Sequence, residues 1–178
     1  MDDVIRGYWA CAKNNGDFIC VETWSGYRGG SDLDYKAKQH LLAPDVSDEA
    51  LGIAVLDALA HSRFVLPAPR AGSTYPPNLE FDMILCDYKL KAERYTKWVT
   101  DLMAHYGYKT KRALFKNMHS CGIDQYSDSI KIRPSHHEKL EAWGREKDDG
   151  IEDVIIPANS IPVEIGAALR LAFSRCTG

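Results

Sequence analysis

The sequence has no apolar run that approaches the roughly 18 residues needed to span a membrane. Its first residues, MDDVIRGYWACAKNN, are acidic at once and hold no long apolar core, so we expect neither a signal peptide nor a membrane partner. It also lacks any CxxC or zinc-finger spacing among its five cysteines, which are Cys11, Cys20, Cys86, Cys121 and Cys176. Their odd number and apolar neighbours indicate buried, reduced thiols. We therefore expect a cytoplasmic protein without a cofactor.

Catalytic motifs are equally scarce. A zinc protease needs two histidines four apart on a helix with a glutamate beside the first, and this pattern is absent. His136, His137 and Glu138 look metal-binding, but adjacent histidines on a strand or loop point in different directions. We expect no metal and no catalytic residue. His136 or His137 is predicted to hydrogen-bond the backbone instead. The enzyme alternative is a histidine-dependent or metal-dependent activity at His119 or His137.

Charge is distributed unevenly along the chain, although its formal net charge is only −3. Residues 1–60 carry ten acidic and five basic side chains, a local balance of −5. Residues 89–117 carry eight Lys or Arg and two acidic side chains, a balance of +6. The sequence therefore predicts an acidic side and a basic side. An alternative function follows: binding of RNA or single-stranded nucleic acid by residues 89–117, although a solvated helix face is the commoner outcome.

The composition is that of an ordinary globular domain, with 178 residues, 45% hydrophobic and 26% charged. Alternating apolar and β-branched residues predict two hairpins. Residues 14–17, NNGD, supply the turn of the first hairpin, and residues 127–129 supply the turn of the second. The strands are expected over residues 4–12, 18–24, 112–119, 130–133 and 154–156, with an undecided short strand within 79–85.

Three helices are predicted. The first follows Ser47, which can cap its N-terminus. The longest covers residues 88–106 and ends at Gly107, a natural C-cap. The last follows residues 159–160 and has Pro162 in its first turn. The buried stripe of the long helix is expected to consist of Tyr95, Val99, Leu102 and Tyr106.

The two halves of the chain echo each other. The pattern P-x-x-S precedes both the first and the last helix, at residues 44–47 and 157–160. Each of these helices then contains an aliphatic residue followed by glycine, at 51–52 and 165–166. We predict a single α+β domain over residues 1–178, mainly an antiparallel sheet from two hairpins packed by three main helices, with a pseudo-twofold duplication as a further hypothesis.

Residues 25–39, SGYRGGSDLDYKAKQ, are predicted to form a long loop because they contain three glycines and alternating charge. Aromatic residues and arginine anchor protein interfaces, so this composition suits protein recognition. A solvated loop without a function is the alternative.

A resemblance to a known family is carried by long segments. The stretch GYKTKRALFKNMHSCGI, followed by IKIRPSHHEKLEAWG, VIIPANS and IGAALRLAFSRC, closely resembles the CdiI immunity proteins of bacterial contact-dependent growth inhibition (CDI) systems. FICVETWSGY and LLAPDVSDEALGIAVLDALAHSRF resemble the N-terminal half of the same family. The similarity covers most of the chain, loosely in residues 28–40 and 67–94 and densely from residue 107 onward. No catalytic signature comes with it.

The resemblance implies a non-enzymatic cytoplasmic protein that binds the toxic C-terminal domain of a CdiA effector and blocks it. Such toxins are often nucleases, frequently RNases, with basic surfaces around the phosphate site. A complementary partner offers acidic and aromatic groups from a rigid scaffold. Two stretches meet this description, residues 24–35 and the acidic loop 146–153. The expected toxin-binding residues are Trp24, Tyr27, Arg28, Asp32, Asp34, Tyr35, Asp148 and Asp149.

Overall fold

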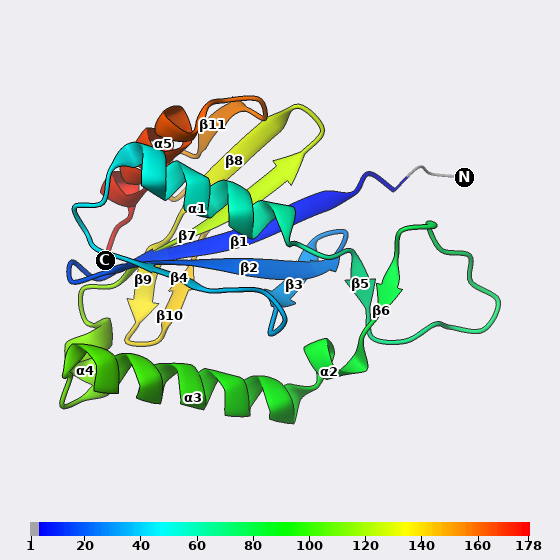
Figure 1. Cartoon of the computed structure of the whole chain (residues 1–178), viewed down its shortest axis with the longest axis horizontal. Helices are drawn as coiled ribbons and strands as arrows, with labels where there is room; N and C mark the ends of the chain where they lie inside the picture. Colours follow the sequence, from blue (N-terminus) through cyan, green and yellow to red (C-terminus); the bar gives the residue numbers. More distant parts are fainter. Residues whose placement is uncertain (1–3) are drawn as a thin grey trace.

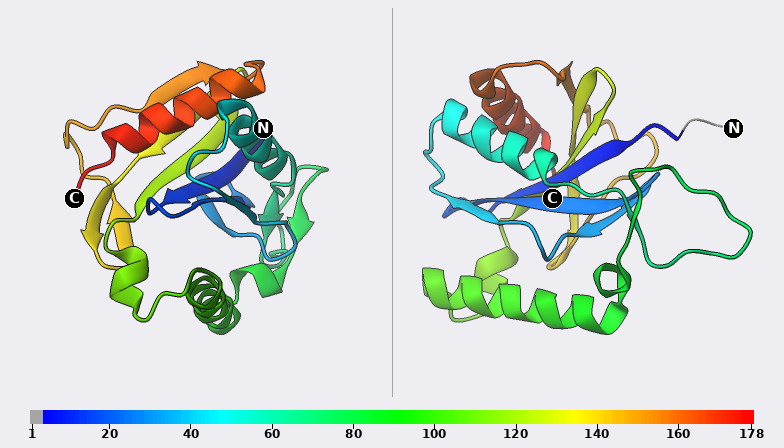
Figure 2. Two further views of the ribbon diagram at one scale, coloured as in Figure 1. Left: turned by 60° about the vertical axis from the view of Figure 1, so that its left-hand side comes forward. Right: turned by 45° about the vertical axis from the view of Figure 1, so that its right-hand side comes forward.

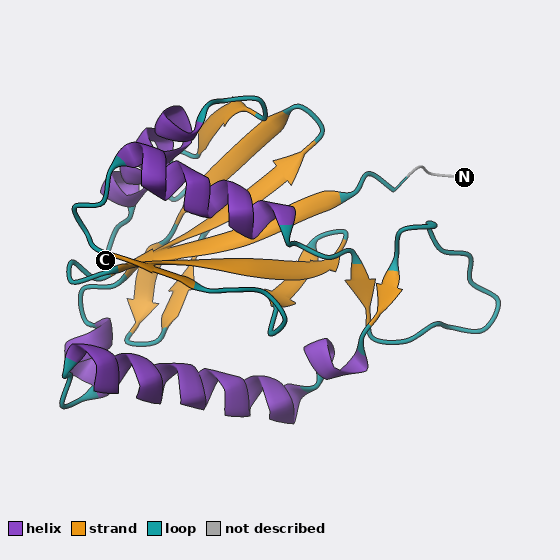
Figure 3. Ribbon diagram, viewed as in Figure 1, coloured by secondary structure: helices purple, strands orange, loops and turns teal. Residues whose placement is uncertain are grey.

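The computed structural model describes residues 4–178 as a large antiparallel sheet with helices on both faces (Figures 1 and 3). The sheet contains β1 (Gly7–Asn14), β2 (Ile19–Tyr27), β3 (Gly30–Leu33), β4 (His40–Leu42), β7 (His119–Tyr126), β8 (Ser129–Pro134) and β11 (Val154–Pro157). The helices are α1 (Asp48–Ala60), α2 (Met83–Cys86), α3 (Tyr88–Tyr106), α4 (Lys111–Phe115) and α5 (Pro162–Arg175). Two small sheets pair β5 (Val65–Leu66) with β6 (Glu80–Phe81), and β9 (His136–Lys139) with β10 (Ala142–Gly144).

The predicted α+β class, with a mainly antiparallel sheet from two hairpins and three main helices, is confirmed. The expected domain of residues 1–178 includes residues 1–3, which lie outside the described part of the chain. The capping predictions also hold. The Ser47 side chain accepts a hydrogen bond from the Ala50 amide, Gly107 ends α3 in the left-handed region with φ 73°, and Pro162 is the first residue of α5.

Apart from β3, the sheet is arranged symmetrically about its centre. Its strand order is β11-β8-β7-β1-β2-β3, and β4 also pairs with β2. The hairpins β1–β2 and β7–β8 meet where β1 and β7 pair antiparallel, from Gly7 opposite Tyr126 to Asn14 opposite His119. On each side, a third antiparallel strand pairs with the outer strand of the hairpin, and a helix follows it: β4 and α1 in one half, β11 and α5 in the other. This arrangement agrees with the echo between the two halves of the sequence.

Two glycines allow α1 and α5 to approach each other closely. A Cβ atom on Gly52 would lie 1.8 Å from the carbonyl oxygen of Pro162, and one on Gly166 would lie 1.9 Å from the carbonyl oxygen of Asp48. Pro162 and Asp48 are the first residues of α5 and α1, so the glycine of each helix meets the start of the other. Reciprocal contacts of this kind are those of a twofold-related pair. The aliphatic-glycine pairs in the sequence therefore mark the helix crossing.

The crossed helices cover one face of the sheet, and α3 with α4 lies on the other (Figure 2). Under α1 and α5 the side chains form a continuous apolar core, which includes Ala12, Val21, Leu51, Ile132 and Leu169. The cluster on the α3 side is smaller and consists of Phe18, Cys20, Val99, Leu102, Leu114, Phe115 and Met118. The two faces are thus unequal: one is a packed core and the other is only partly covered.

The buried stripe predicted for α3 holds for the C-terminal half of the helix alone. Val99 and Leu102 are its only buried residues, and Tyr95 is 38% exposed. Periodicity marks the side of the helix that faces the protein, but it does not show how closely the helix approaches the sheet. The N-terminal half of α3 stands over a cavity, which is described below.

The long loop predicted at residues 25–39 is wrong in its first part. β2 continues to Tyr27 and β3 begins at Gly30, so the segment is a tight antiparallel hairpin. Arg28 makes the turn with φ 55°. A Cβ atom on Gly26 would lie 1.9 Å from the carbonyl oxygen of Gly30. Gly26 therefore allows two strands to approach closely, although glycine at this position was interpreted from the sequence as part of a loop.

The strand predicted at residues 112–119 is also wrong in its first part. The segment begins as α4, because the Thr110 side chain accepts a hydrogen bond from the Ala113 amide and caps a short helix. The strand β7 starts only at His119. The undecided segment 79–85 contains β6 and the first turn of α2.

We predict that Gly52→Ala and Gly166→Ala each destabilise the protein by about 1–3 kcal/mol or more, because the added methyl group must push α1 and α5 apart. Urea unfolding monitored by circular dichroism measures the effect. Gly29→Ala is the matched control, since nothing lies within 4 Å of a Cβ atom at that position. If the two helix variants unfolded at the same urea concentration as the Gly29→Ala control, this result would contradict the close contact between α1 and α5.

Candidate functional site

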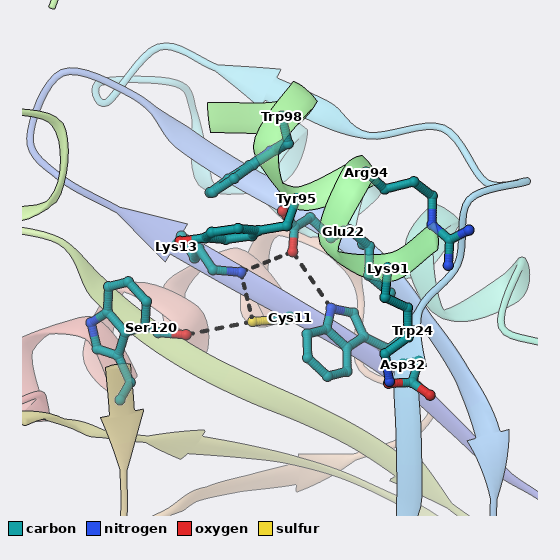
Figure 4. A pocket seen from close by; sticks show the side chains of 12 residues that line it. Cys11, Lys13, Glu22, Trp24, Asp32, Lys91, Arg94, Tyr95, Trp98 and Ser120 are labelled. Atoms are coloured by element: carbon teal, nitrogen blue, oxygen red, sulfur yellow. Dashed lines mark hydrogen bonds and ion pairs between the residues drawn. The ribbon is translucent and has the colours of Figure 1, made fainter. Parts of the chain in front are cut away.

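A cavity of about 360 Å³ lies between the sheet and α3 (Figure 4). Its lining comes from β1, β2, β3, β7, α3 and β10, and consists of Cys11, Lys13, Glu22, Trp24, Asp32, Leu33, Lys91, Arg94, Tyr95, Trp98, Ser120 and Trp143. A second cavity of about 280 Å³ shares Cys11, Trp24, Ser120 and Trp143 with the first and extends to Arg133 and Arg145. We call the two cavities together the groove.

Strand alternation separates the groove from the core. Successive side chains of a strand point to opposite faces of the sheet. In β1, Ala10 and Ala12 enter the core under α1 and α5, while Cys11 and Lys13 line the groove. The same alternation in β2 places Val21 in the core and Glu22 in the groove. The groove face is therefore the polar side of strands whose other side is apolar.

The floor of the groove contains a buried ion pair. The Lys13 Nζ atom lies 2.9 Å from Glu22 Oε2, with side-chain exposures of 12% and 2%. Glu22 also accepts a hydrogen bond from Gln39 Nε2 at 2.9 Å, and Trp24 Nε1 lies 3.5 Å from its Oε2 atom. Burial alone lowers the pKa of the Lys13 ammonium, but the neighbouring Cys11 and Glu22 outweigh it and hold that pKa above its ordinary value. Lys13 is therefore charged at neutral pH.

Tryptophan side chains form much of the wall. Trp98 lies 5.9 Å from the ring of Tyr95 between centroids. Trp143 is fixed by two contacts: its Nε1 atom donates to the Met118 carbonyl oxygen at 2.7 Å, and its ring stacks on His137 at 5.0 Å. The wall is thus apolar and partly immobilised, which is the character of residues that dominate protein interfaces.

Polar contacts hold α3 over the groove at two places. Near its start, Lys91 Nζ lies 2.7 Å from Asp32 Oδ1 on β3. Farther along, the Tyr95 hydroxyl donates to Glu141 Oε1 at 2.8 Å, and Lys111 Nζ lies 3.2 Å from the same oxygen. These contacts replace apolar packing beneath the N-terminal half of the helix. The space under α3 is therefore bounded by ion pairs and remains open between them.

The structure divides the predicted residues of 24–35 into two groups. Trp24 and Asp32 line the groove. Tyr35 lies beside it, because its ring is 5.0 Å from the guanidinium of the groove residue Arg94. Tyr27 packs on Phe64 at 4.8 Å and so belongs to the end of the hairpin. Arg28, in the turn next to Tyr27, is exposed, and its guanidinium lies 5.4 Å from the Tyr27 ring.

Asp34 is part of a buried polar network. It is 3% exposed, accepts a hydrogen bond from Ser25 Oγ at 2.6 Å, and pairs with Arg63 through both of its carboxylate oxygens at 2.6 and 3.0 Å. Burial opposes ionisation, yet the hydrogen bonds from Arg63 and Ser25 hold the pKa of Asp34 below its ordinary value. The geometry of Asp34 suits it to hold the strand β3 and the Arg63 segment together.

The predicted acidic loop lies at the other end of the groove. Asp149 accepts hydrogen bonds from Arg145 at 2.6 and 3.1 Å, and Arg145 lines the second cavity. The Arg145 guanidinium lowers the pKa of Asp149 to about 2. Asp148 is exposed and adopts φ 61°. Trp24 and Ser31 of the first predicted surface and Arg145, the partner of Asp149, line the same second cavity.

Four groove residues were not predicted from the sequence: Lys13, Glu22, Trp98 and Trp143. The signal for the first two was a charged residue inside each of two otherwise apolar strands. Such a charge is paired when it is buried, but the sequence does not show which partner it meets. Trp98 and Trp143 come from segments far apart in the chain. Only the tertiary structure brings them to one cavity.

The histidines have structural contacts. His137 Nε2 lies 3.0 Å from the Leu140 carbonyl oxygen, which confirms the predicted backbone hydrogen bond. His136 Nδ1 lies 2.8 Å from the Thr177 hydroxyl. Among residues 4–178, no group of three or more His, Cys, Asp or Glu side chains is placed to hold a metal ion. Nor does any helix within the described chain have the length and apolar character to cross a membrane.

The basic region 89–117 is partly neutralised by its own neighbours. Lys91 pairs with Asp32, Lys97 pairs with Asp101 and Lys111 pairs with Glu141, at nitrogen–oxygen distances of 2.7, 2.5 and 3.2 Å. A lysine that pairs with a carboxylate offers less to a phosphate backbone. No contact in this region favours nucleic acid over protein as the partner.

Comparisons with known proteins agree with one another. The model of the CDI immunity protein family matches residues 8–176. Immunity protein CdiI-YPIII of Yersinia pseudotuberculosis serotype O:3 (strain YPIII) is 55% identical over 178 residues, which are 100% of each chain. A solved CdiA-CT/CdiI toxin and immunity complex from Y. pseudotuberculosis contains a similar chain, with a TM-score of 0.93, 55% identity, and coverage of 98% of this chain and 100% of that chain. A protein of unknown function from Neisseria meningitidis has a TM-score of 0.81, 40% identity and 99% coverage of both chains.

We predict that Asp34→Asn lowers the free energy of unfolding at pH 7 by about 3 kcal/mol, because Arg63 loses a buried carboxylate. Since the pKa of Asp34 is depressed in the folded protein, its contribution is present above about pH 4 and is lost as the pH falls through the folded value. The difference between wild type and variant should therefore shrink from pH 7 to pH 3 in urea unfolding experiments. Asp101→Asn, an exposed ion-pair residue, is the control and should cost less than about 1 kcal/mol. An equal difference at every pH would contradict the assignment.

Proposed function

Because the chain belongs to the CDI immunity protein family, as its resemblance predicted, we propose that it binds the C-terminal toxin domain of a cognate CdiA protein and neutralises it. The Y. pseudotuberculosis complex supports the proposal, since a chain of the same fold is there part of a toxin and immunity complex. The function is one of binding rather than catalysis. It takes place in the cytoplasm, where the toxin would act.

The groove is the observation that carries the proposed binding site. It is the place on the described chain where tryptophan and tyrosine side chains surround a cavity of about 360 Å³ without filling it. Buried aromatic anchors contribute most of the binding energy in protein interfaces, and they act from pockets that exclude water. A toxin segment that enters the groove would bury Trp24, Trp98 and Trp143 together.

The two predicted surfaces fit around this centre. Trp24 and Asp32 lie in the groove itself, and Tyr35 lies at its edge. Asp149 lies next to the second cavity through its ion pair with Arg145, and Asp148 is its exposed neighbour in the chain. We propose that these charges act at the rim and mainly speed association. Among the other predicted residues, Asp34 and Tyr27 support the β2–β3 hairpin, and Arg28 is exposed at its tip.

The toxin is proposed to be a nuclease, with RNA as its substrate, as the resemblance implies. A nuclease presents a basic surface to its phosphate substrate. Of the charged residues in the described range 4–60, only Lys13, Glu22 and Asp32 line the first cavity, and Lys91 and Arg94 of α3 join them there. The acidic loop 146–153, with five acidic side chains and one basic, is the stretch that suits a basic partner.

Co-expression tests the proposed function. The toxin domain encoded beside this chain is produced from an inducible promoter in cells that carry either this chain or the empty vector. We expect growth only in the presence of this chain, together with a stable complex on size-exclusion chromatography. Growth arrest in both strains and no complex would overturn the proposal. RNA from the unprotected cells should be degraded. Intact RNA together with degraded DNA would show that the toxin is a DNase and not an RNase.

We predict that Trp24→Ala weakens toxin binding by about 30-fold, which corresponds to the 2 kcal/mol of a hot-spot residue. The loss should appear mainly in the dissociation rate, measured by surface plasmon resonance. Tyr75→Ala is the matched control, because Tyr75 is an aromatic residue of the 67–79 segment that does not line the groove. Equal affinities of Trp24→Ala and wild type would move the binding site away from the groove.

A further inference from the structure

The Lys13 ammonium in the groove floor is not fully satisfied. An ammonium group has three N–H donors. Within residues 4–178, the acceptors for Lys13 are Glu22 Oε2 at 2.9 Å and Cys11 Sγ at 3.5 Å. Sulfur is a weak acceptor, and the Trp98 ring, 5.5 Å from the Nζ atom, contributes only a cation–π contact. At least one N–H donor of Lys13 is therefore not used by a strong protein acceptor, and it is available to a molecule that enters the cavity.

Glu22, by contrast, has no shortage of donors. Its two oxygens receive Lys13 and Gln39, each at 2.9 Å. Trp24 Nε1 and Cys20 Sγ add longer contacts at 3.5 and 3.6 Å (Figure 4 shows those of Lys13 and Trp24). The Glu22 carboxylate thus has several donors around it, whereas the Lys13 ammonium has only one strong acceptor among the described residues. The floor of the groove can therefore take a further hydrogen-bond acceptor.

The Trp98 indole N–H also has no hydrogen-bond partner among the described residues, but it is buried and closed to the cavity. Trp98 and Lys13 line the same cavity and lie in contact through the cation–π interaction. Of these two donors, the Lys13 ammonium is the one that an oxygen atom of a partner in the groove can reach.

A partner that fills the groove must supply a hydrogen-bond acceptor to Lys13. Its apolar groups displace water from the tryptophan walls, and a Lys13 N–H group that then has neither water nor an acceptor weakens the complex. A chain segment brings main-chain carbonyl groups of its own, which need donors once they leave water. Its carbonyl oxygens and the Lys13 ammonium therefore have complementary needs.

The Lys13–Glu22 ion pair favours a neutral acceptor at Lys13, whereas the other cations of the cavity, Lys91 and Arg94, come from α3 on the opposite wall. Lys13 is already neutralised by Glu22 at 2.9 Å. A carboxylate from the toxin that approached Lys13 would also approach Glu22, and like charges repel strongly in a desolvated site. A carbonyl oxygen carries no such penalty.

We propose that the toxin segment that occupies the groove places a main-chain carbonyl oxygen on the Lys13 ammonium. The inference rests on the proposed toxin-binding function and adds the chemistry of the contact. It also defines a selection rule. A segment with an acidic side chain at this point is rejected by Glu22, and one that offers no oxygen leaves Lys13 without its acceptor.

The test measures the affinity of the toxin domain encoded with this chain for four forms of the immunity protein: wild type, Lys13→Met/Glu22→Gln, Glu22→Gln and Lys97→Met. The double variant removes the donor without leaving Glu22 charged and alone, and it should bind about 10- to 100-fold more weakly. The loss should be the same at 50 and 500 mM NaCl, because the acceptor is neutral. Lys97→Met, a change at an exposed lysine outside the groove, should bind as wild type does.

Glu22→Gln distinguishes the two kinds of acceptor. With a carbonyl partner its affinity should stay within a few-fold of wild type. A carboxylate partner would instead bind this variant much more tightly and lose that gain in high salt, and this result would overturn the proposal. Wild-type affinity of the double variant would overturn it as well, while leaving the proposed function intact.

A structure of the wild-type complex provides a measurement that does not depend on the folding of any variant. We expect a toxin carbonyl oxygen within about 3.2 Å of Lys13 Nζ. A carboxylate oxygen, a water molecule or an empty groove at this position overturns the inference alone. Failure of the wild-type chain to bind the toxin at all overturns the proposed function with it.

Discussion

The pairing of β1 with β7 at the centre of the sheet is the contact on which the other features depend. It joins the two hairpins in register over eight residue pairs. Each hairpin then carries its own third strand and helix, and the two helices cross on one face at Gly52 and Gly166. Because α1 and α5 build the main apolar core on that face, the opposite face of the same strands can hold polar groups. The groove is a consequence of this division.

The two ends of α3 are held over the groove by different kinds of contact. At one end of α3, Val99 and Leu102 pack into a small apolar cluster. At the other end, the Lys91–Asp32 ion pair takes the place of apolar packing. A helix held in this way stands away from the sheet without leaving it. For the toxin segment that we propose to bind here, a preformed cavity reduces the cost of ordering on binding.

Several features that depend on a few neighbouring residues were predicted correctly from the sequence, and several that depend on distant segments were not. The cap at Ser47, the C-cap at Gly107 and the hairpin turns depend on a few neighbouring residues, and these predictions were confirmed. Glycine was misread at residues 25–39, where it permits two strands to approach closely. Trp24 and Asp32 were predicted as binding residues from composition, and the structure places both in the groove. Their role in binding stays a prediction.

The α+β class, the two hairpins, the three main helices and the family could be predicted from the sequence, because these depend on local chemistry and on long characteristic segments. The groove could not be predicted, because it forms only when distant segments pack together. Lys13 and Glu22 come from two strands, Trp98 from α3 and Trp143 from β10, and their meeting depends on strand register and on the height of α3 above the sheet. Neither quantity is encoded in any single segment, since both arise from the packing of all the elements together.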